Sequence, residues 1–190
     1  MTTSYLFGYG SILWRQDFVP IRTMIGTLRG YSRVINQAST DHRGTVHRPG
    51  AVASLRTSPQ RFVVGKLFEI APSDQDRVFE KLDVREQNGY SLIPISVEVG
   101  EAIFEAVTYI ALPGNPWDLG EPSIDQLVQT ILLAAGPSGS NMDYILQLYR
   151  ECQIMSSGDE PWKALVAALA HSPRFVRRAA ALKIELPDPH

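Results

Sequence analysis

The residue types most able to do chemistry gather near the start of the chain. A short apolar strand is predicted to end in the tight sequence Gly8-Tyr9-Gly10-Ser11. Because glycine has no Cβ, such a turn can curl so that consecutive backbone N–H groups point at one carboxylate or phosphate, with the Ser11 hydroxyl as an extra donor. A glycine turn after a strand also fits plain turn chemistry, so the segment alone leaves both readings open. The candidate ligand-binding residues are Gly8, Tyr9, Gly10, Ser11, Ile12 and Leu13.

This turn does not indicate a nucleotide site. The dinucleotide fingerprint needs a third glycine where Leu13 stands, and then a long helix, which Pro20 disfavours. The phosphate-loop pattern, which closes on Gly-Lys-Ser or Gly-Lys-Thr, is also absent from the segment. The acidic ligand of this turn is therefore expected to be something other than a nucleotide.

A second segment with chemical potential runs from Leu82 to Tyr90, where a predicted helix gives way to a strand. It holds Asp83, Arg85 and Glu86. Charges at the end of a helix are usually solvated, and Asp83 is expected to pair with Arg85 or Lys81. By the same reasoning Glu86 would have no special role, and these residues alone do not decide the matter.

Histidine and cysteine indicate neither a metal site nor a nucleophile. His42 and His47 stand five residues apart in a predicted loop with no third ligand nearby in the sequence. The single cysteine, Cys152, lies in a helix-like stretch, where we expect a packed thiol. We therefore expect no metal and no cofactor.

Composition narrows the class of partner. The chain has 190 residues, of which 44% are hydrophobic, and a net charge of −2, which together predict a single domain over residues 1–190. Its charges are scattered, so no stripe for nucleic acid and no patch for a membrane is expected. No apolar run approaches the ~18 residues of a membrane span, and the start lacks the basic region of a signal peptide. We predict a cytoplasmic protein that binds a small polar molecule.

The first two-thirds of the chain have the pattern of short strands. Several alternate apolar and polar residues, as half-buried antiparallel strands do, and together they predict a curled sheet or small barrel. A helix that opens at Pro72-Ser73, with Val78, Phe79 and Leu82 on one face, separates two groups of strands. The expected strands span residues 5–8, 24–28, 32–36, 51–57, 62–70, 92–99 and 104–112.

The last third changes to helical spacing. Ser123 and Gln126 form a capping box ahead of an apolar face, and the Gly-Pro-Ser-Gly run at 136–139 ends that helix. Two further helices are expected, one through Ile145 and one through Leu165. The predicted class is α+β, a small mixed or antiparallel β-barrel flanked by helices, with a C-terminal helical segment.

Five separated motifs resemble those of the ChaC-type, glutathione-specific γ-glutamylcyclotransferases. Residues 7–14 are similar to the family's FGYGSLIW loop, and residues 85–90 to its REKxGY segment. Residues 41–45, 108–116 and 136–144 resemble its DHRGT, TYIAxPxNP and GPSGPNxxY segments. These motifs stand in family order, and their combination is specific.

The resemblance implies a γ-glutamylcyclotransferase-like barrel and a reaction. The α-amino group of glutathione attacks its own γ-carbonyl, which forms 5-oxoproline and releases Cys-Gly. Glu86 matches the family position for the carboxylate that moves the protons as general base and acid, and residues 8–13 match the substrate cradle. The substrate supplies the nucleophile, so the resemblance implies no metal and no cofactor.

Alternatives remain open at this point. Val46 and Ala51 depart from the family's usual Pro and Arg, in a loop where Arg43 or Arg48 is expected to meet the Cys-Gly carboxylate. The substrate could instead be a γ-glutamyl amino acid or amine. A noncatalytic module that binds an acidic metabolite is a third reading, which Glu86 disfavours because a carboxylate would repel an acidic ligand.

Overall fold

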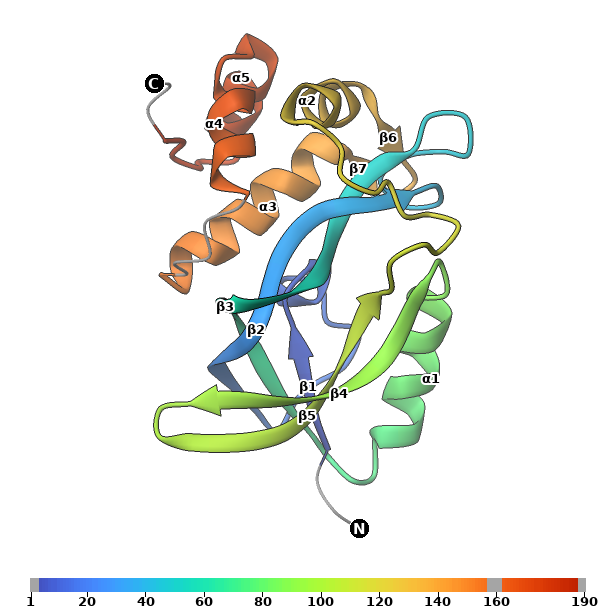
Figure 1. The fold of residues 1–190 in the computed structure, drawn as a ribbon, viewed down its shortest axis with the longest axis vertical. Coiled ribbons are helices and arrows are strands. Elements are labelled where there is room, and N and C mark those ends of the chain that lie inside the picture. Colours follow the sequence, from blue (N-terminus) through green and yellow to red (C-terminus); the bar gives the residue numbers. More distant parts are fainter. Residues whose placement is uncertain (1–3, 157–161, 188–190) are drawn as a thin grey trace.

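The computed structural model describes residues 4–156 and 162–187 and contains a closed five-stranded barrel in the order β1-β3-β2-β4-β5 (Figure 1). Strand β1 runs parallel to β5, and the other neighbouring pairs are antiparallel. The mixed barrel confirms the predicted α+β class. The strands are β1 (Ser4–Gly8), β2 (Arg22–Ser39), β3 (Gly50–Ile70), β4 (Tyr90–Val99) and β5 (Ala102–Ala111).

The prediction of separate short strands is wrong for β2 and β3. Each of these strands joins two expected ones, because their pairing continues through irregularities at Arg29/Tyr31 and at Ile35/Gln37. Gly30 lies at the first irregularity with φ of 79°, a conformation that residues with a Cβ rarely adopt. At the expected break, Gly30 of β2 and residues 58–61 of β3 are left out of the register, and the pairing resumes beyond them.

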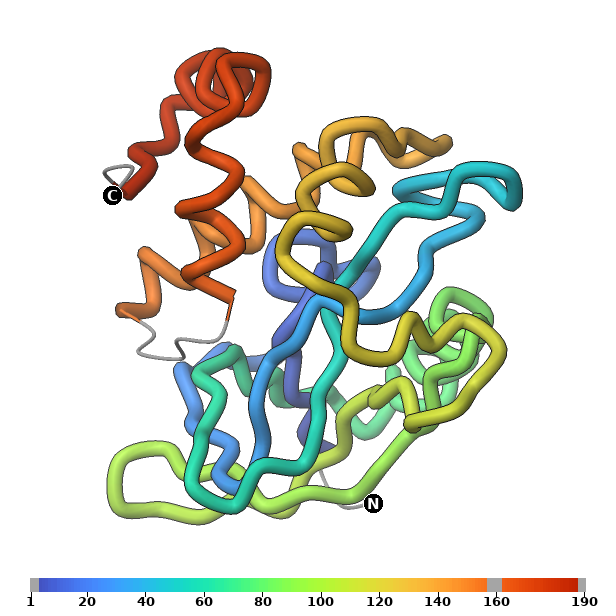
Figure 2. Tube along the Cα trace, turned by 45° about the horizontal axis from the view of Figure 1, so that its top comes forward, coloured from blue at the N-terminus to red at the C-terminus, as the bar shows by residue number. Residues whose placement is uncertain are grey.

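Helices flank the barrel on two sides (Figures 1 and 2). Helix α1 (Gln75–Arg85) lies beside β4, and helices α2 (Ile124–Leu133) to α5 gather at the other end of the molecule. The Ser123 capping box is confirmed, because the Ser123 hydroxyl accepts the Gln126 N–H and the Gln126 side chain accepts the Ser123 N–H. Helices α3 (Asn141–Ile154) and α4 (Lys163–Ala170) are the expected pair.

The sequence analysis missed helix α5 (Pro173–Ala181). Its signals are local: Pro173 stands in its first turn, where the missing N–H costs nothing, and Phe175 and Ala179 share a buried face. One hydrophobic cluster joins barrel residues such as Leu67 to α2, α3, α4 and α5, while a smaller cluster packs α1 against β1.

Two loops that carry family-like motifs are packed backbone to backbone. A Cβ on Gly44 would come within 3 Å of the backbone of Gly50, and one on Gly136 within 3 Å of the backbone of His42 and Gly44. The Ser138 N–H, in the hairpin of β6 (Ala135–Gly136) and β7 (Gly139–Ser140), donates to the His42 carbonyl at 3.0 Å. These glycines permit a contact that brings residues 41–50 against the start of α3.

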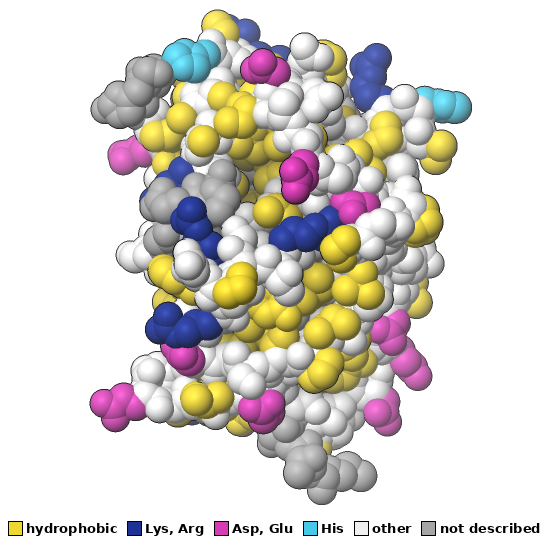
Figure 3. All heavy atoms as spheres, viewed as in Figure 1, with side chains coloured by type: hydrophobic (Ala, Val, Ile, Leu, Met, Phe, Trp, Pro, Cys, Tyr) yellow, Lys and Arg dark blue, Asp and Glu magenta, His cyan; other side chains and the backbone are white. Residues whose placement is uncertain are grey.

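The surface agrees with the scattered charge of the sequence. On the face drawn in Figure 3, basic and acidic side chains are scattered among apolar and uncharged groups. Within residues 4–156 and 162–187, no helix has the length and apolar character needed to cross a bilayer.

Candidate active site

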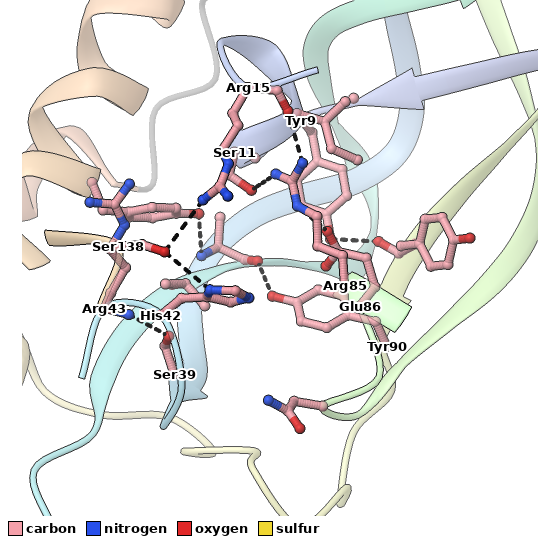
Figure 4. Close-up of a pocket in the computed structure, with 18 of the residues that line it drawn as sticks. Tyr9, Ser11, Arg15, Ser39, His42, Arg43, Arg85, Glu86, Tyr90 and Ser138 are labelled. Carbon is pink, nitrogen blue, oxygen red and sulfur yellow. Dashed lines mark hydrogen bonds and ion pairs between the residues drawn. The ribbon is translucent and has the colours of Figure 1, made fainter. Parts of the chain in front are cut away.

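A pocket opens where the end of β1, the end of α1 and the two packed loops meet (Figure 4). Strand β1 delivers the glycine turn, which continues into the short 3-10 helix η1 (Ser11–Leu13), and α1 delivers Glu86 immediately after its last residue. Five of the six predicted binding residues line this pocket together with Glu86. They are Gly8, Tyr9, Gly10, Ser11 and Ile12.

Leu13 is not among the residues that line the pocket. Its side chain is 1% exposed and belongs to the main hydrophobic cluster. Its N–H donates to the Gly10 carbonyl at 3.0 Å, and its own carbonyl accepts from Lys66 Nζ at 2.7 Å. Leu13 therefore anchors the turn to the core, and both its backbone groups and its side chain are engaged within the protein.

The two glycines of the turn serve different purposes. A Cβ on Gly8 would lie 2.9 Å from the Phe68 ring, so core packing requires a glycine there. A Cβ on Gly10 would meet nothing closer than Tyr144 Oη at 3.5 Å. The first internal bond of η1 uses the Leu13 N–H, so the N–H groups of Ser11 and Ile12 precede it and have no partner within the turn. Gly10 keeps the approach to these donors open.

Glu86 is held at the C-terminal end of α1, where its backbone N–H donates to the Leu82 carbonyl at 2.8 Å. Its side chain is only 14% exposed. Burial raises the pKa of this carboxyl above its ordinary value, Arg85 lowers it, and the charge of Asp41 raises it. A carboxylate with a raised pKa inside a pocket is suited to accept and return a proton.

Arg85 joins Glu86 to the glycine turn, a role in the site that the sequence analysis did not assign to it. Its Nη2 donates to Ser11 Oγ at 2.7 Å, its Nη1 donates to the Arg15 carbonyl at 2.8 Å, and its Nε lies 3.4 Å from Glu86 Oε1 (Figure 4). Because Ser11 Oγ accepts from Arg85, its own O–H is left to donate to a ligand. The expected pair of Asp83 and Arg85 is not formed, and Asp83 accepts the Tyr109 hydroxyl at 2.6 Å instead.

The phenol of Tyr9 is bound within the protein. Its hydroxyl donates to the Tyr109 carbonyl at 2.7 Å, so this O–H is already bound to the protein. Burial raises the pKa of Tyr9, which keeps the phenol protonated. Any contact of Tyr9 with a ligand is therefore made by its ring or backbone.

The far side of the pocket is basic. Arg15 Nη1 donates to Ser138 Oγ at 3.3 Å, and His42 Nδ1 lies 3.2 Å from the same oxygen (Figure 4). Arg43 lies over the Tyr144 ring, 5.8 Å from its centroid. Arg15 and Arg43 both line the pocket, whereas Arg48 is exposed outside it. Of the two cations expected to meet a distant carboxylate, only Arg43 is in position.

Metal ligands do not gather in this site. In the ranges 4–156 and 162–187, no three His, Cys, Asp or Glu side chains lie close enough together to hold a metal ion. His42 faces Ser138, and His47 is exposed in the neighbouring loop. The absence of a cofactor stays a prediction.

Sequence comparison gives close parallels over most of the chain. The model of a family described as ChaC-like protein matches residues 4–172. The human glutathione-specific γ-glutamylcyclotransferase 1 is 31% identical over 172 residues, which cover 87% of this chain and 78% of that protein. The γ-glutamylcyclotransferase 2-3 of Arabidopsis thaliana is 33% identical over 153 residues, which cover 76% of this chain and 77% of that protein.

Structure comparison agrees on the fold. A crystal structure of a yeast γ-glutamyl cyclotransferase specific to glutathione superimposes with a TM-score of 0.86 at 24% identity. The superposition covers 90% of this chain and 97% of the yeast chain. The barrel and its flanking helices are therefore a shared architecture.

Proposed function

This chain belongs to the ChaC-like protein family, and on that premise we propose that it is a γ-glutamylcyclotransferase that acts on glutathione. The products would be 5-oxoproline and Cys-Gly. The observation that carries the proposal is the pairing of a buried carboxylate with a glycine turn: Glu86 and Ser11 line one pocket and are joined through Arg85.

The first task of the site is to fold the glutamyl group toward a five-membered ring. The N–H groups of Ser11 and Ile12, with the Ser11 hydroxyl, would hold the glutamyl α-carboxylate near the Arg85 guanidinium. Holding the amine and the γ-carbonyl in contact turns the reaction into a well-oriented intramolecular attack, which can supply about 7 to 11 kcal/mol of the barrier.

The second task is proton transfer, which we assign to Glu86. The α-amine, which first gives up its ammonium proton to solvent, attacks the γ-carbon to form the new C–N bond. The Glu86 carboxylate takes the proton that the attacking nitrogen must then lose. When the old amide bond breaks, the protonated carboxyl returns a proton to the departing nitrogen of the cysteinyl residue. Glu86 ends as a carboxylate, and the released amine of Cys-Gly takes back from solvent the proton that the α-ammonium group gave up.

The experiment that tests this function is a search for 5-oxoproline. The purified protein is incubated with glutathione and, in parallel, with γ-glutamyl-alanine. We expect 5-oxoproline from glutathione, with kcat/KM at least about tenfold higher than for γ-glutamyl-alanine, because Arg43 can pair with the more distant carboxylate. Equal or reversed values would indicate a general γ-glutamyl enzyme, and no 5-oxoproline from either compound would contradict the proposal.

The loop arginines offer a matched pair for the same assay. Arg43→Gln should lower kcat/KM for glutathione about tenfold and change the value for γ-glutamyl-alanine much less, because it removes one charge-assisted hydrogen bond. Arg48→Gln removes the same charge from the exposed part of the same loop and should change neither value. Equal losses in the two variants would mean that the general charge of the loop matters, and that Arg43 makes no specific contact.

Chelation tests the expectation that no metal takes part. We expect dialysis against EDTA to leave kcat and KM unchanged, because the proposed chemistry needs a proton carrier and no Lewis acid. The measurement is the rate of 5-oxoproline formation before and after dialysis. Activity that is lost and then restored by zinc or magnesium would contradict the cofactor-free mechanism.

Three broader predictions accompany this function. The hydrophobic cluster shared by the barrel and α2 to α5 supports a single domain over residues 1–190. The single cysteine supports a cytoplasmic location. The scattered charge supports a small-molecule substrate in preference to nucleic acid or membrane.

A further inference from the structure

Four tyrosines line the pocket, and they differ in whether the hydroxyl proton is donated to an acceptor of the protein. Tyr9 donates to the Tyr109 carbonyl, Tyr90 to the Ala53 carbonyl at 2.7 Å, and Tyr109 to Asp83. Tyr144 accepts the Ala53 N–H at 2.9 Å and, among the described residues, donates to no protein acceptor. The Tyr144 proton is therefore the one that these contacts leave available to a ligand.

The Tyr144 hydroxyl faces the reacting end of the pocket. It projects from α3, and it lies 3.5 Å from the point that a Cβ of Gly10 would occupy. The charge of Glu86 raises the pKa of this phenol, as expected for groups that face one space. The hydroxyl thus stands beside the turn that carries the Ser11 and Ile12 N–H groups.

Packing fixes the Tyr144 ring before any substrate binds. The residue is 4% exposed, the Trp14 ring meets it edge to face at 5.5 Å between centroids, and Arg43 covers it at 5.8 Å. The Ala53 N–H then sets the position of the oxygen. A donor held in this way loses little further freedom in the transition state.

We propose that Tyr144 is a catalytic residue that donates a hydrogen bond to the γ-carbonyl oxygen of the substrate. This inference rests on the proposed function. Attack by the amine turns the carbonyl into a tetrahedral intermediate, in which the oxygen carries the electron pair of the broken π bond. The hydroxyl stabilises that charge without giving up its proton, and the pair returns to the carbonyl when the old C–N bond breaks.

The choice of the carbonyl over the α-carboxylate follows from charge. A permanent carboxylate is matched by the turn N–H groups and the nearby Arg85, whereas a neutral phenol beside the Ala53 methyl suits an oxygen that is neutral before the attack. Burial raises the pKa of Tyr144 to about 12, so the phenol remains a donor at neutral pH. Its hydrogen bond strengthens as the oxygen gains charge.

The test compares two pocket variants that each lose one hydroxyl. Tyr144→Phe should lower kcat about 10² to 10³-fold and change KM less than about threefold, because the lost bond acts chiefly in the transition state. Tyr90→Phe removes another hydroxyl of the same pocket, whose proton is bound to the Ala53 carbonyl, and it should cost less than tenfold in kcat. A Tyr144→Phe enzyme with kcat within threefold of wild type, or with a loss confined to KM, would overturn the proposal, as would equal losses in both variants.

A second measurement does not depend on the Phe variant folding. In a crystal structure of the wild-type protein with 5-oxoproline, we expect Tyr144 Oη within hydrogen-bond distance, about 3.2 Å or less, of the lactam oxygen. An oxygen bound elsewhere and out of reach of Tyr144 would reject the role. Wild-type protein that forms no 5-oxoproline would reject the proposed function itself, and the role of Tyr144 with it.

Discussion

Glu86→Gln is expected to lower turnover of glutathione by about 10² to 10⁴-fold or more while the fold is kept. The amide has the shape of the carboxylate but cannot accept the proton of the substrate amine. The measurement is 5-oxoproline formation under saturating glutathione. A Gln variant within a few-fold of wild type would show that Glu86 is not the base.

A matched control separates this loss from a general effect of charge. Glu80→Gln removes a carboxylate from an exposed position on the same helix, and it should leave kcat and KM unchanged. Circular dichroism and the thermal midpoint of both variants would verify that α1 and the barrel are intact. Comparable losses in the two variants would assign the effect to the charge of the helix.

The ionisation of Glu86 sets the direction in which kcat/KM changes with pH. Burial raises the pKa of Glu86, and the base works only when ionised, so kcat/KM should fall as the pH drops through this raised pKa. The acid limb should lie above the ordinary value for a glutamate, and it should disappear from the residual activity of Glu86→Gln. An acid limb that persists in the Gln variant would belong to another group.

The raised pKa of Glu86 affects stability in the opposite direction from activity: ionisation of Glu86 activates the enzyme but destabilises the fold. The folded state holds the Glu86 proton more tightly than the unfolded chain does. The contribution of Glu86 to the free energy of unfolding is therefore fully present below the pKa of the unfolded state, and it is lost as the pH rises through the pKa of the folded state. At neutral pH the wild-type protein therefore keeps an ionised carboxylate in a place that disfavours charge. We expect the thermal midpoint of Glu86→Gln at pH 7 to equal or exceed that of wild type.

Local signals made part of this fold predictable. The Ser123 capping box depends on residues three apart, and the expected bond pair forms. Strands β2 and β3 were predicted as separate pieces because a gap in the register, at Gly30 and residues 58–61, interrupts the alternation before the pairing resumes. What decides their continuity is the partner strand, which the sequence pattern of one segment does not contain.

The residues of the site were also predictable only in part. The turn residues are adjacent in sequence, and their glycines carry a physical signal that can be read directly. Arg85 and Ser11 are 74 residues apart, so no local spacing indicates that one donates to the other. Likewise, the difference between Tyr9 and Tyr144 lies only in which backbone group each hydroxyl meets, Tyr109 O or Ala53 N. Such partners are determined by the closure of the barrel, which brings distant segments together, and local sequence does not contain them.

Gly10→Val is expected to weaken binding of 5-oxoproline by about 10²-fold or more at a modest cost in stability. The first atom of the new side chain would stand 3.5 Å from Tyr144 Oη, and the two methyl groups beyond it would fill the approach to the turn N–H groups. Displacing a bound group by even 1 Å can cost about 10²-fold in activity. Isothermal titration with 5-oxoproline measures the affinity, and thermal unfolding measures the stability.

Two further glycine variants make this prediction specific. Gly10→Ala adds only the first atom, at an ordinary contact distance, and should fall between wild type and Val in affinity. Gly8→Ala should give the reverse pattern, because its Cβ would press on the Phe68 ring at 2.9 Å and lower the thermal midpoint. A folded Gly10→Val protein that binds 5-oxoproline as well as wild type would place the cradle elsewhere, since the side chain would then occupy space that the ligand does not use.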